Sequence, residues 1–176
     1  ARRRQKVTAV HKANVFRLSD GLFLDAVRKV RDEFPNIEYE EQIVDAMAAL
    51  LIRAPEKYDV IVTTNMYGDI LSDQASEIAG SLGLAASLNA GERFAMAQAQ
   101  HGSAPDIAGQ GVANTIGQIW SGAMMMEHLG HPDAARAIEK AIEIVLTEGG
   151  PRTKDMCGNA GTVTVCDAIA EALADV

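Results

Sequence analysis

Residues 59–73, with the sequence DVIVTTNMYGDILSD, contain a short apolar run followed directly by a helical pattern. The run Asp59–Thr64 is rich in β-branched residues, which predicts a buried strand. From Ile70 to Ala79 the apolar residues recur at helical spacing, which predicts a helix. A buried strand that leads into a helix is the repeating unit of α/β folds, so this stretch predicts an α/β protein.

The segments before residue 59 alternate in the same way. Their patterns predict strands at Lys6–Val10 and Ile37–Tyr39. A helix is expected to begin near Ser19 and to stop at Pro35, and a second one is expected at about Val44–Arg53. The order of these elements again indicates strands that alternate with helices.

The segments after residue 79 differ in composition. Between Gly80 and Gly111 the chain is rich in Gly, Ala, Ser and Asn, with one candidate strand at Phe94–Ala97. Stretches of this kind form loops that carry chemistry. The remaining pattern predicts three helices, at Ile116–Leu129, Asp133–Thr147 and about Val163–Ala174.

The composition limits the classes of protein to which the chain can belong. It has 176 residues, 48% of them hydrophobic, and 16 Lys and Arg against 24 Asp and Glu, with a net charge of −8. This size allows one ordinary globular domain or two small lobes. The acidic excess would repel a polyanion, so we expect no nucleic-acid partner.

The sequence also bears on the compartment. It has no run of about 20 apolar residues, so we expect no membrane-spanning helix and no membrane partner. The N-terminal segment lacks the apolar stretch of a signal peptide. Cys157 and Cys166 fit a reducing compartment better than a disulfide framework. We therefore expect a cytoplasmic protein.

Three aspartates are candidate metal ligands. Asp69 and Asp73 are four residues apart, so on a helix they share one face, and they repel each other unless a cation lies between them. Carboxylates at this spacing suit Mg²⁺ or Mn²⁺. An acidic first turn that complements the helix dipole is the alternative interpretation. Asp45 opens the preceding helix, either as a third ligand or as its N-cap.

Lys12 is a candidate base. It follows the strand predicted at Lys6–Val10 and is flanked by apolar residues. Desolvation of such a lysine lowers its pKa and makes it able to accept a proton. A lysine after a strand is also commonly a solvated loop residue, so both interpretations stay open.

The segment His101–Gly109, HGSAPDIAG, is a candidate nucleotide-binding loop that leads to Asn114 and then a helix. Its small residues allow a ligand to approach the backbone, and Asp106 can accept both hydroxyls of an adenosine ribose. It is not a GxGxxG fingerprint, and a mobile loop with ordinary turn chemistry is the alternative.

In combination, the four segments Val10–Asn14, Ile43–Arg53, Asp59–Asp73 and His101–Asn114 resemble the isocitrate/isopropylmalate dehydrogenase family of β-decarboxylating dehydrogenases. The resemblance covers essentially the whole chain and implies the C-terminal portion of that α/β fold. Residues 1–80 would be the second part of the interface domain. Residues 81–176 would be the C-terminal part of the larger domain.

The resemblance also implies roles for individual residues. Lys12 matches the catalytic lysine, and Asn14 matches an asparagine that contacts substrate or nicotinamide. The three metal-binding aspartates match Asp45, Asp69 and Asp73. NADP-dependent relatives carry Lys-Tyr at the positions of Asp106 and Ile107, so the cofactor implied is NAD, with Mg²⁺ or Mn²⁺. The residues that match the cofactor-binding positions are His101, Gly102, Ser103, Ala104, Asp106, Ile107 and Asn114.

The activity implied is oxidative decarboxylation of a 2-hydroxy acid with a 3-carboxylate. His11 and the run Ser19–Phe23 look closest to the NAD-isocitrate and homoisocitrate branch. A 3-isopropylmalate or tartrate/malate dehydrogenase is the alternative substrate class, and a non-catalytic regulatory or dimerisation paralogue is the alternative of another kind.

The resemblance further implies how the chain would assemble. Members of the family form homodimers with shared active sites, so Lys12 and Asp45 would act in the site of the neighbouring subunit. The N-terminal half of the family subunit has no counterpart in this sequence, so we expect the 176-residue chain to be inactive alone and to work with a separate or missing N-terminal half.

Overall fold

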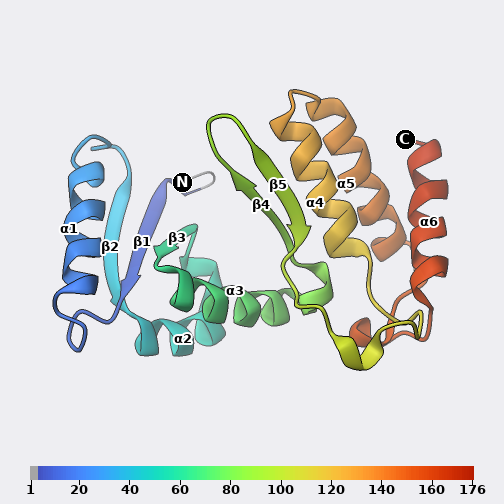
Figure 1. The fold of residues 1–176 in the computed structure, drawn as a ribbon. Coiled ribbons are helices and arrows are strands. Elements are labelled where there is room, and N and C mark those ends of the chain that lie inside the picture. The colour runs from blue at the N-terminus through green and yellow to red at the C-terminus, as the bar shows by residue number, and fades with distance from the viewer. Residues whose placement is uncertain (1–3) are drawn as a thin grey trace. The chain divides into compact units, whose positions relative to one another are not determined.

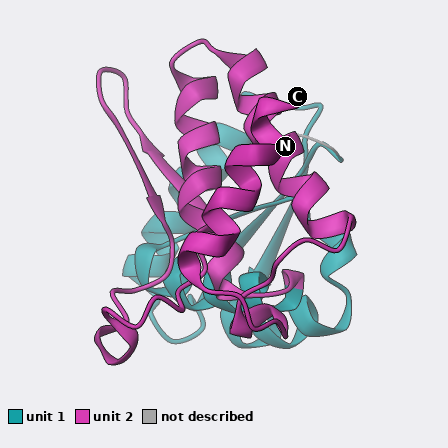
Figure 2. Cartoon of the chain, turned by 90° about the vertical axis from the view of Figure 1, so that its right-hand side faces the viewer, with its two compact units in different colours: residues 1–78 teal, residues 79–176 magenta. Residues whose placement is uncertain are grey.

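The computed structural model describes residues 4–176. The chain divides into two compact units, residues 1–78 and 79–176 (Figure 2). Strands alternate with helices in the first unit, which confirms the α/β class.

The first unit contains a parallel sheet of three strands in the order β2-β1-β3 (Figure 1). The strands are β1 (Lys6–His11), β2 (Glu38–Ile43) and β3 (Val60–Thr63), and β1 pairs in parallel with both others. Parallel strands end at the same edge of a sheet. The carboxyl ends of all three strands therefore lie together.

Helices cover the two faces of this sheet unequally. Helices α2 (Val44–Arg53) and α3 (Asn65–Ala79) pack on one face, where Val10, Met47, Leu51 and Leu71 form a buried apolar core. Helix α1 (Ser19–Arg31) lies on the other face and leaves an apolar groove of about 660 Å³ between itself and the sheet. The floor and wall of the groove include Val7, Phe23, Val27, Tyr39, Val60 and Val62.

The second unit begins with an antiparallel hairpin of β4 (Ala86–Ala90) and β5 (Ala95–Ala99). Helix α4 (Ile116–His128) holds the hairpin through Ser121. Its hydroxyl lies 2.7 Å from the carbonyl oxygens of both Gln98 and Gly117, can donate to either, and accepts from the backbone N–H of Ser87 at 3.2 Å. Gly117 allows the close approach, because a Cβ there would lie 2.7 Å from the carbonyl oxygen of Ala85. Small residues thus dock this helix onto the hairpin.

Two more helices complete the second unit, α5 (Pro132–Thr147) and α6 (Thr162–Ala174). They share a core with α4 that is built from Ile116, Ala141, Ile142, Val145, Val165 and Ile169. Short 3₁₀ turns lie at Pro55–Lys57, Leu82–Leu84, Pro105–Ile107 and Lys154–Met156. Within residues 4–176, no helix is long and apolar enough to span a membrane.

Several elements differ from the sequence prediction: β1 ends one residue later, α1 ends at Arg31 before reaching Pro35, β5 is Ala95–Ala99, and three further differences are larger. Strand β2 extends to Ile43, because its polar residues find partners on β1: Glu40 accepts from the Thr8 hydroxyl at 2.8 Å and pairs with Lys6 at 2.9 Å. Helix α3 begins at Asn65 rather than Ile70. Strand β4 was not predicted, since its sequence ASLNA has little intrinsic strand preference.

Candidate functional site

Lys12 and Asp45 form an ion pair at the carboxyl edge of the parallel sheet. Lys12 follows the last residue of β1, and its Nζ lies 2.5 Å from Oδ1 of Asp45. The lysine side chain is 24% exposed and the aspartate side chain 67% exposed. The hydrogen bond from Lys12 holds the pKa of Asp45 below its usual range, so the carboxylate is ionised at neutral pH.

The position of Asp45 excludes one of the alternatives left open by the sequence. The N-cap of α2 is Ile43, and Asp45 lies in the first turn of that helix without capping it. The interpretation as an N-cap is therefore wrong. Its carboxylate reaches toward Lys12 instead.

Hydrogen bonds hold the backbone of Lys12 on both its N–H and its carbonyl side. Its N–H donates to Oδ2 of Asp20 at 2.6 Å, and its carbonyl accepts from the N–H groups of Val15 and Phe16, each at 2.9 Å. Asn14 lies exposed in this turn. Sequence reasoning missed Asp20, because an aspartate in the first turn of a helix is ordinary and gives no sign of a partner eight residues away.

Asp20 also has a neighbour on α3. The buried Tyr67 lies close enough to Asp20 for the charge of the carboxylate to act on its phenol. Burial raises the pKa of Tyr67, and the neighbouring negative charge raises it further, so the phenol keeps its proton at neutral pH. Asp20 thus lies near both the Lys12 turn and the start of α3.

Asp69 and Asp73 lie on α3 and are both exposed. Because the helix begins at Asn65, Asp69 falls in its second turn, so the alternative of an acidic first turn is wrong. Their spacing places both on one face of the helix. Among residues 4–176, no three His, Cys, Asp or Glu side chains form a metal-binding group. A single described chain therefore does not bring Asp45 together with Asp69 and Asp73.

The predicted cofactor loop is open. Gly102, Ser103, Ala104 and Asp106 are exposed, and His101 and Ile107 are half-buried. The loop turns at Ala104, whose φ is +40°, and continues as the 3₁₀ turn Pro105–Ile107. A Cβ added at Gly102 would meet no atom within 4 Å, so the backbone can be approached from outside.

Asn114 is the one buried member of the predicted cofactor set. Its Nδ2 donates to Oδ2 of Asp155 at 2.9 Å, and its Oδ1 accepts from the N–H of Ile116 at 3.0 Å. The Ser81 hydroxyl donates to the same oxygen of Asp155. Gly83 leaves room for this cluster, because a Cβ there would lie 2.6 Å from Cβ of Asn114. The Asn114 side chain is thus engaged within the protein.

Asp155 was also missed by sequence reasoning, since its partners lie 41 and 74 residues away along the chain. Partial burial raises the pKa of its carboxyl group, but hydrogen bonds from Asn114 and Ser81 outweigh burial and lower it. The ionised form therefore helps to hold the segments around Ser81 and Asn114 together.

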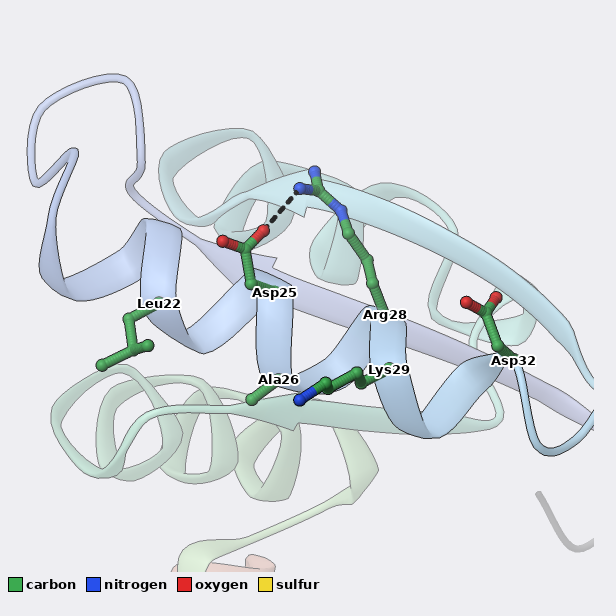
Figure 3. Close-up of a pocket in the computed structure, with 6 residues that line it drawn as sticks. All are labelled: Leu22, Asp25, Ala26, Arg28, Lys29 and Asp32. Atoms are coloured by element: carbon green, nitrogen blue, oxygen red, sulfur yellow. Dashed lines mark hydrogen bonds and ion pairs between the residues drawn. The ribbon is translucent and has the colours of Figure 1, made fainter.

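Two hollows lined by described residues of the first unit lie away from the predicted site residues. One, lined by Leu22, Asp25, Ala26, Arg28, Lys29 and Asp32, lies along α1 (Figure 3). There Arg28 pairs with Asp25 at 3.2 Å and makes two hydrogen bonds of 2.7 Å to the carboxylate of Glu41. These contacts fasten α1 to β2. The apolar groove on the same side of the sheet likewise contains none of the predicted residues.

Comparisons with known proteins agree with the resemblance described above. The sequence model of the isocitrate/isopropylmalate dehydrogenase family matches residues 1–173. The isocitrate/homoisocitrate dehydrogenase of Thermus thermophilus is 50% identical over 172 residues, which cover 98% of this chain and 51% of that protein. An Arabidopsis thaliana protein named isocitrate dehydrogenase [NAD] catalytic subunit 5, mitochondrial, is 43% identical over 97% of this chain and 46% of its own length.

A solved structure agrees as well. The crystal structure of isocitrate dehydrogenase from Methylococcus capsulatus matches 97% of this chain and 51% of that chain, with a TM-score of 0.94 and 47% identity. The chain spans about half the length of the curated relatives that it matches.

The Asp155 cluster makes a prediction about pH. A carboxyl group with a lowered pKa stabilises the folded state above its ordinary pKa, and this stabilisation is lost as the pH falls through the lowered value. Asp155→Asn should reduce the free energy of unfolding at pH 7 by on the order of 1 kcal/mol. The difference from the wild type should shrink in acid, below about pH 3 to 4.

Urea denaturation at both pH values measures this difference. Asp167→Asn, which removes an exposed carboxylate from α6 in the same unit, is the matched control and should change little at either pH. A deficit of Asp155→Asn that is equally large in acid and at pH 7 would contradict the proposed ionic contribution.

Proposed function

This chain belongs to the isocitrate/isopropylmalate dehydrogenase family, and on that premise we propose that it serves the NAD⁺-dependent oxidative decarboxylation of a 2-hydroxy acid with a 3-carboxylate. The pairing of Lys12 with Asp45 is the observation that carries the proposal. It places a candidate base beside a candidate metal ligand at the edge where three parallel strands end. Relatives named isocitrate/homoisocitrate dehydrogenase and NAD isocitrate dehydrogenase support isocitrate or homoisocitrate as the substrate, and relatives of similar identity named 3-isopropylmalate dehydrogenase support 3-isopropylmalate as the alternative.

The acidic residues suit a hard divalent cation. Asp45, Asp69 and Asp73 offer carboxylate oxygens, which Mg²⁺ and Mn²⁺ prefer. Asp69 and Asp73 share one face of α3, and Asp45 is ionised at neutral pH. Since one chain does not bring the three together, we propose that Asp45 of one subunit completes the metal site with Asp69 and Asp73 of another.

The loop His101–Ile107 suits a dinucleotide. Its small residues are exposed, and Asp106 presents a carboxylate that can accept ribose hydroxyls and repel a 2′-phosphate. The side chain of Asn114 is already bonded to Asp155, so its own contribution would come through the backbone. These features support NAD⁺ rather than NADP⁺ as the cofactor.

The chain's own residues would carry the proton chemistry. Lys12, released from its ion pair with Asp45, would take the proton from the substrate hydroxyl directly or through a water molecule. Asn14, exposed in the same turn, would contact the substrate or nicotinamide. When bound, NAD⁺ supplies a hydride acceptor and the divalent cation supplies Lewis-acid stabilisation of negative charge on the substrate oxygen.

A shared site requires a dimer, and α2 and α3 offer a surface for one. Ile52 on α2 and Ile70 and Ile78 on α3 are exposed apolar residues. Pairing of these helices with their symmetry mates would bury this surface in a four-helix arrangement. We also propose that the protein acts in the cytoplasm, and that the 176-residue chain needs further polypeptide to grip the substrate.

The metal proposal predicts the behaviour of Asp73→Asn in the longest natural polypeptide that contains this sequence. Loss of one carboxylate ligand should raise the Mn²⁺ concentration needed for half-maximal rate by about tenfold or more. The measurement is the rate of NAD⁺ reduction with isocitrate or homoisocitrate as Mn²⁺ is varied. Asp25→Asn on α1 is the control, and an unchanged Mn²⁺ dependence for Asp73→Asn would refute the assignment.

The cofactor proposal predicts a change of preference. Replacing Asp106 with Lys and Ile107 with Tyr removes the repulsive carboxylate and adds a cation, so the ratio of kcat/KM for NAD⁺ to that for NADP⁺ should fall by at least about tenfold. Glu92→Lys makes a similar change of charge in the β4–β5 turn and should leave the ratio unaltered. A wild-type protein that already prefers NADP⁺ would show the interpretation of Asp106 to be wrong.

The dimer proposal predicts the mass of the 176-residue chain in solution. Light scattering should report a dimer, and the double variant Ile52→Glu with Ile70→Glu should be monomeric because it places charges in the apolar interface. Leu22→Glu, on the exposed side of α1, is the control and should remain dimeric. A monomeric wild type would defeat the interface, and turnover by the 176-residue chain would defeat the claim that it needs further polypeptide.

A further inference from the structure

Asp20 is a nearly buried acidic residue that the proposed reaction does not use. It lies in the first turn of α1 and is 5% exposed. Burial of a carboxylate is costly unless hydrogen bonds replace its water. Asp20 has such bonds: its Oδ2 accepts from the backbone N–H of Lys12 at 2.6 Å, and its Oδ1 accepts from the Ser19 hydroxyl at 3.3 Å.

Asp20 joins two segments that are separate in the sequence and lies near a third. Lys12 lies in the turn after β1, and Asp20 in the first turn of α1 accepts a hydrogen bond from its backbone N–H. Tyr67, in the first turn of α3, is buried and lies close enough for the charge of Asp20 to act on its phenol. The carboxylate therefore bonds to the segment that carries the candidate base, near the start of the helix that carries two candidate metal ligands.

We propose that Asp20 is a positioning residue of the dehydrogenase site, which fixes the backbone of Lys12 to the first turn of α1. The inference rests on the proposed function, in which Lys12 is the base. It adds a residue that touches neither substrate nor cofactor and acts through the main chain of Lys12.

The backbone at Lys12 needs such a partner. The residue after a strand loses its pairing in the sheet, and an unpaired buried N–H is costly. The Lys12 carbonyl is already fixed by the N–H groups of Val15 and Phe16, so the bond to Asp20 completes the restraint on both sides of its Cα. A lysine side chain is flexible, so a fixed Cα and the pairing with Asp45 together define where Nζ lies.

The chemistry of a carboxylate fits this task. Lys12 and Ser19 each present a donor, and an ionised carboxylate is the side chain that offers only acceptors. An asparagine at position 20 keeps one acceptor oxygen for the Lys12 N–H but lacks the negative charge that acts on Tyr67. An alanine removes every one of these bonds. The two variants therefore separate loss of the bond from loss of the charge.

The test compares Asp20→Ala, Asp20→Asn and Tyr67→Phe in the longest natural polypeptide that contains this sequence. In Asp20→Ala the amide of Lys12 should exchange with solvent at least about tenfold faster. Because misplacement of a reacting group by about 1 Å can cost up to 100-fold in rate, kcat with isocitrate or homoisocitrate should fall at least about tenfold. KM for NAD⁺ should stay within about twofold, since the predicted cofactor loop lies in the other unit.

The conservative variants provide the rescue. Asp20→Asn should recover most of kcat and most of the protection of the Lys12 amide, and Tyr67→Phe should lose less of both than Asp20→Ala does. Leu24→Val shortens a buried side chain of α1 close to Asp20, so it controls for general weakening of the helix. It should lower the melting temperature without lowering kcat of the folded protein.

Three results would overturn the proposal. These are unchanged exchange at Lys12 in Asp20→Ala, an equal loss of kcat in Leu24→Val, and a loss of kcat in Asp20→Asn as large as in Asp20→Ala. If the wild type oxidises no 2-hydroxy acid, the proposed function fails. The hydrogen-exchange data then decide by themselves whether Asp20 holds the backbone of Lys12. Faster exchange at Lys12 with rescue by Asn would support the holding role of Asp20, and unchanged exchange would refute it.

Discussion

Parallel pairing of β1 with both β2 and β3 is the constraint on which the candidate site depends. The register aligns His11 with Ile43 and Val10 with Thr63, so the three strands end together at one edge. Each strand is followed there by a segment that carries candidate site residues. These are Lys12 after β1, Asp45 in the first turn of α2 after β2, and the two aspartates of α3 after β3. A slip of one residue in either pairing would turn alternate side chains to the wrong face and separate these groups.

Two polar contacts at this edge differ in their physical character. The pair of Lys12 and Asp45 is accessible to water, which screens it and allows either partner to be exchanged for a ligand. The Asp20 carboxylate is shielded from water and bonds to the main chain of Lys12. This contact therefore fixes the position of the Lys12 backbone and is not open to exchange with a ligand. The second unit uses Asp155 in a comparable way, since one of its oxygens joins Ser81 and Asn114. In both units an aspartate outside the predicted site holds a residue of that site.

The sequence predicts elements whose signals are local. Helix α2 has the predicted bounds, because an apolar repeat before Pro55 defines it. The start of α3 was missed, since Asn65 and Gly68 are typical of turns, yet the N–H of Gly68 bonds to the carbonyl of Thr64 and opens the helix. Strand β4 depends on partners in β5 and α4. Asp20 and Asp155 were missed for the same reason, because hydrogen bonds to residues distant in the sequence leave no pattern in it.

The strand order also determines how this sheet can assemble. Among its three strands, β1 comes first in the chain and lies in the middle, with Lys6 pairing to Glu38 and Val7 to Val60. During synthesis β1 therefore emerges with neither of its neighbours, and each pairing must close a long loop before it gains any contact. Helix α1 is built from local hydrogen bonds, so it can form before β1 pairs with either neighbour. The carboxyl edge of the sheet is complete only after β3 and α3 have been synthesised. Until then, Lys12 follows a strand that has no partner on its β3 side.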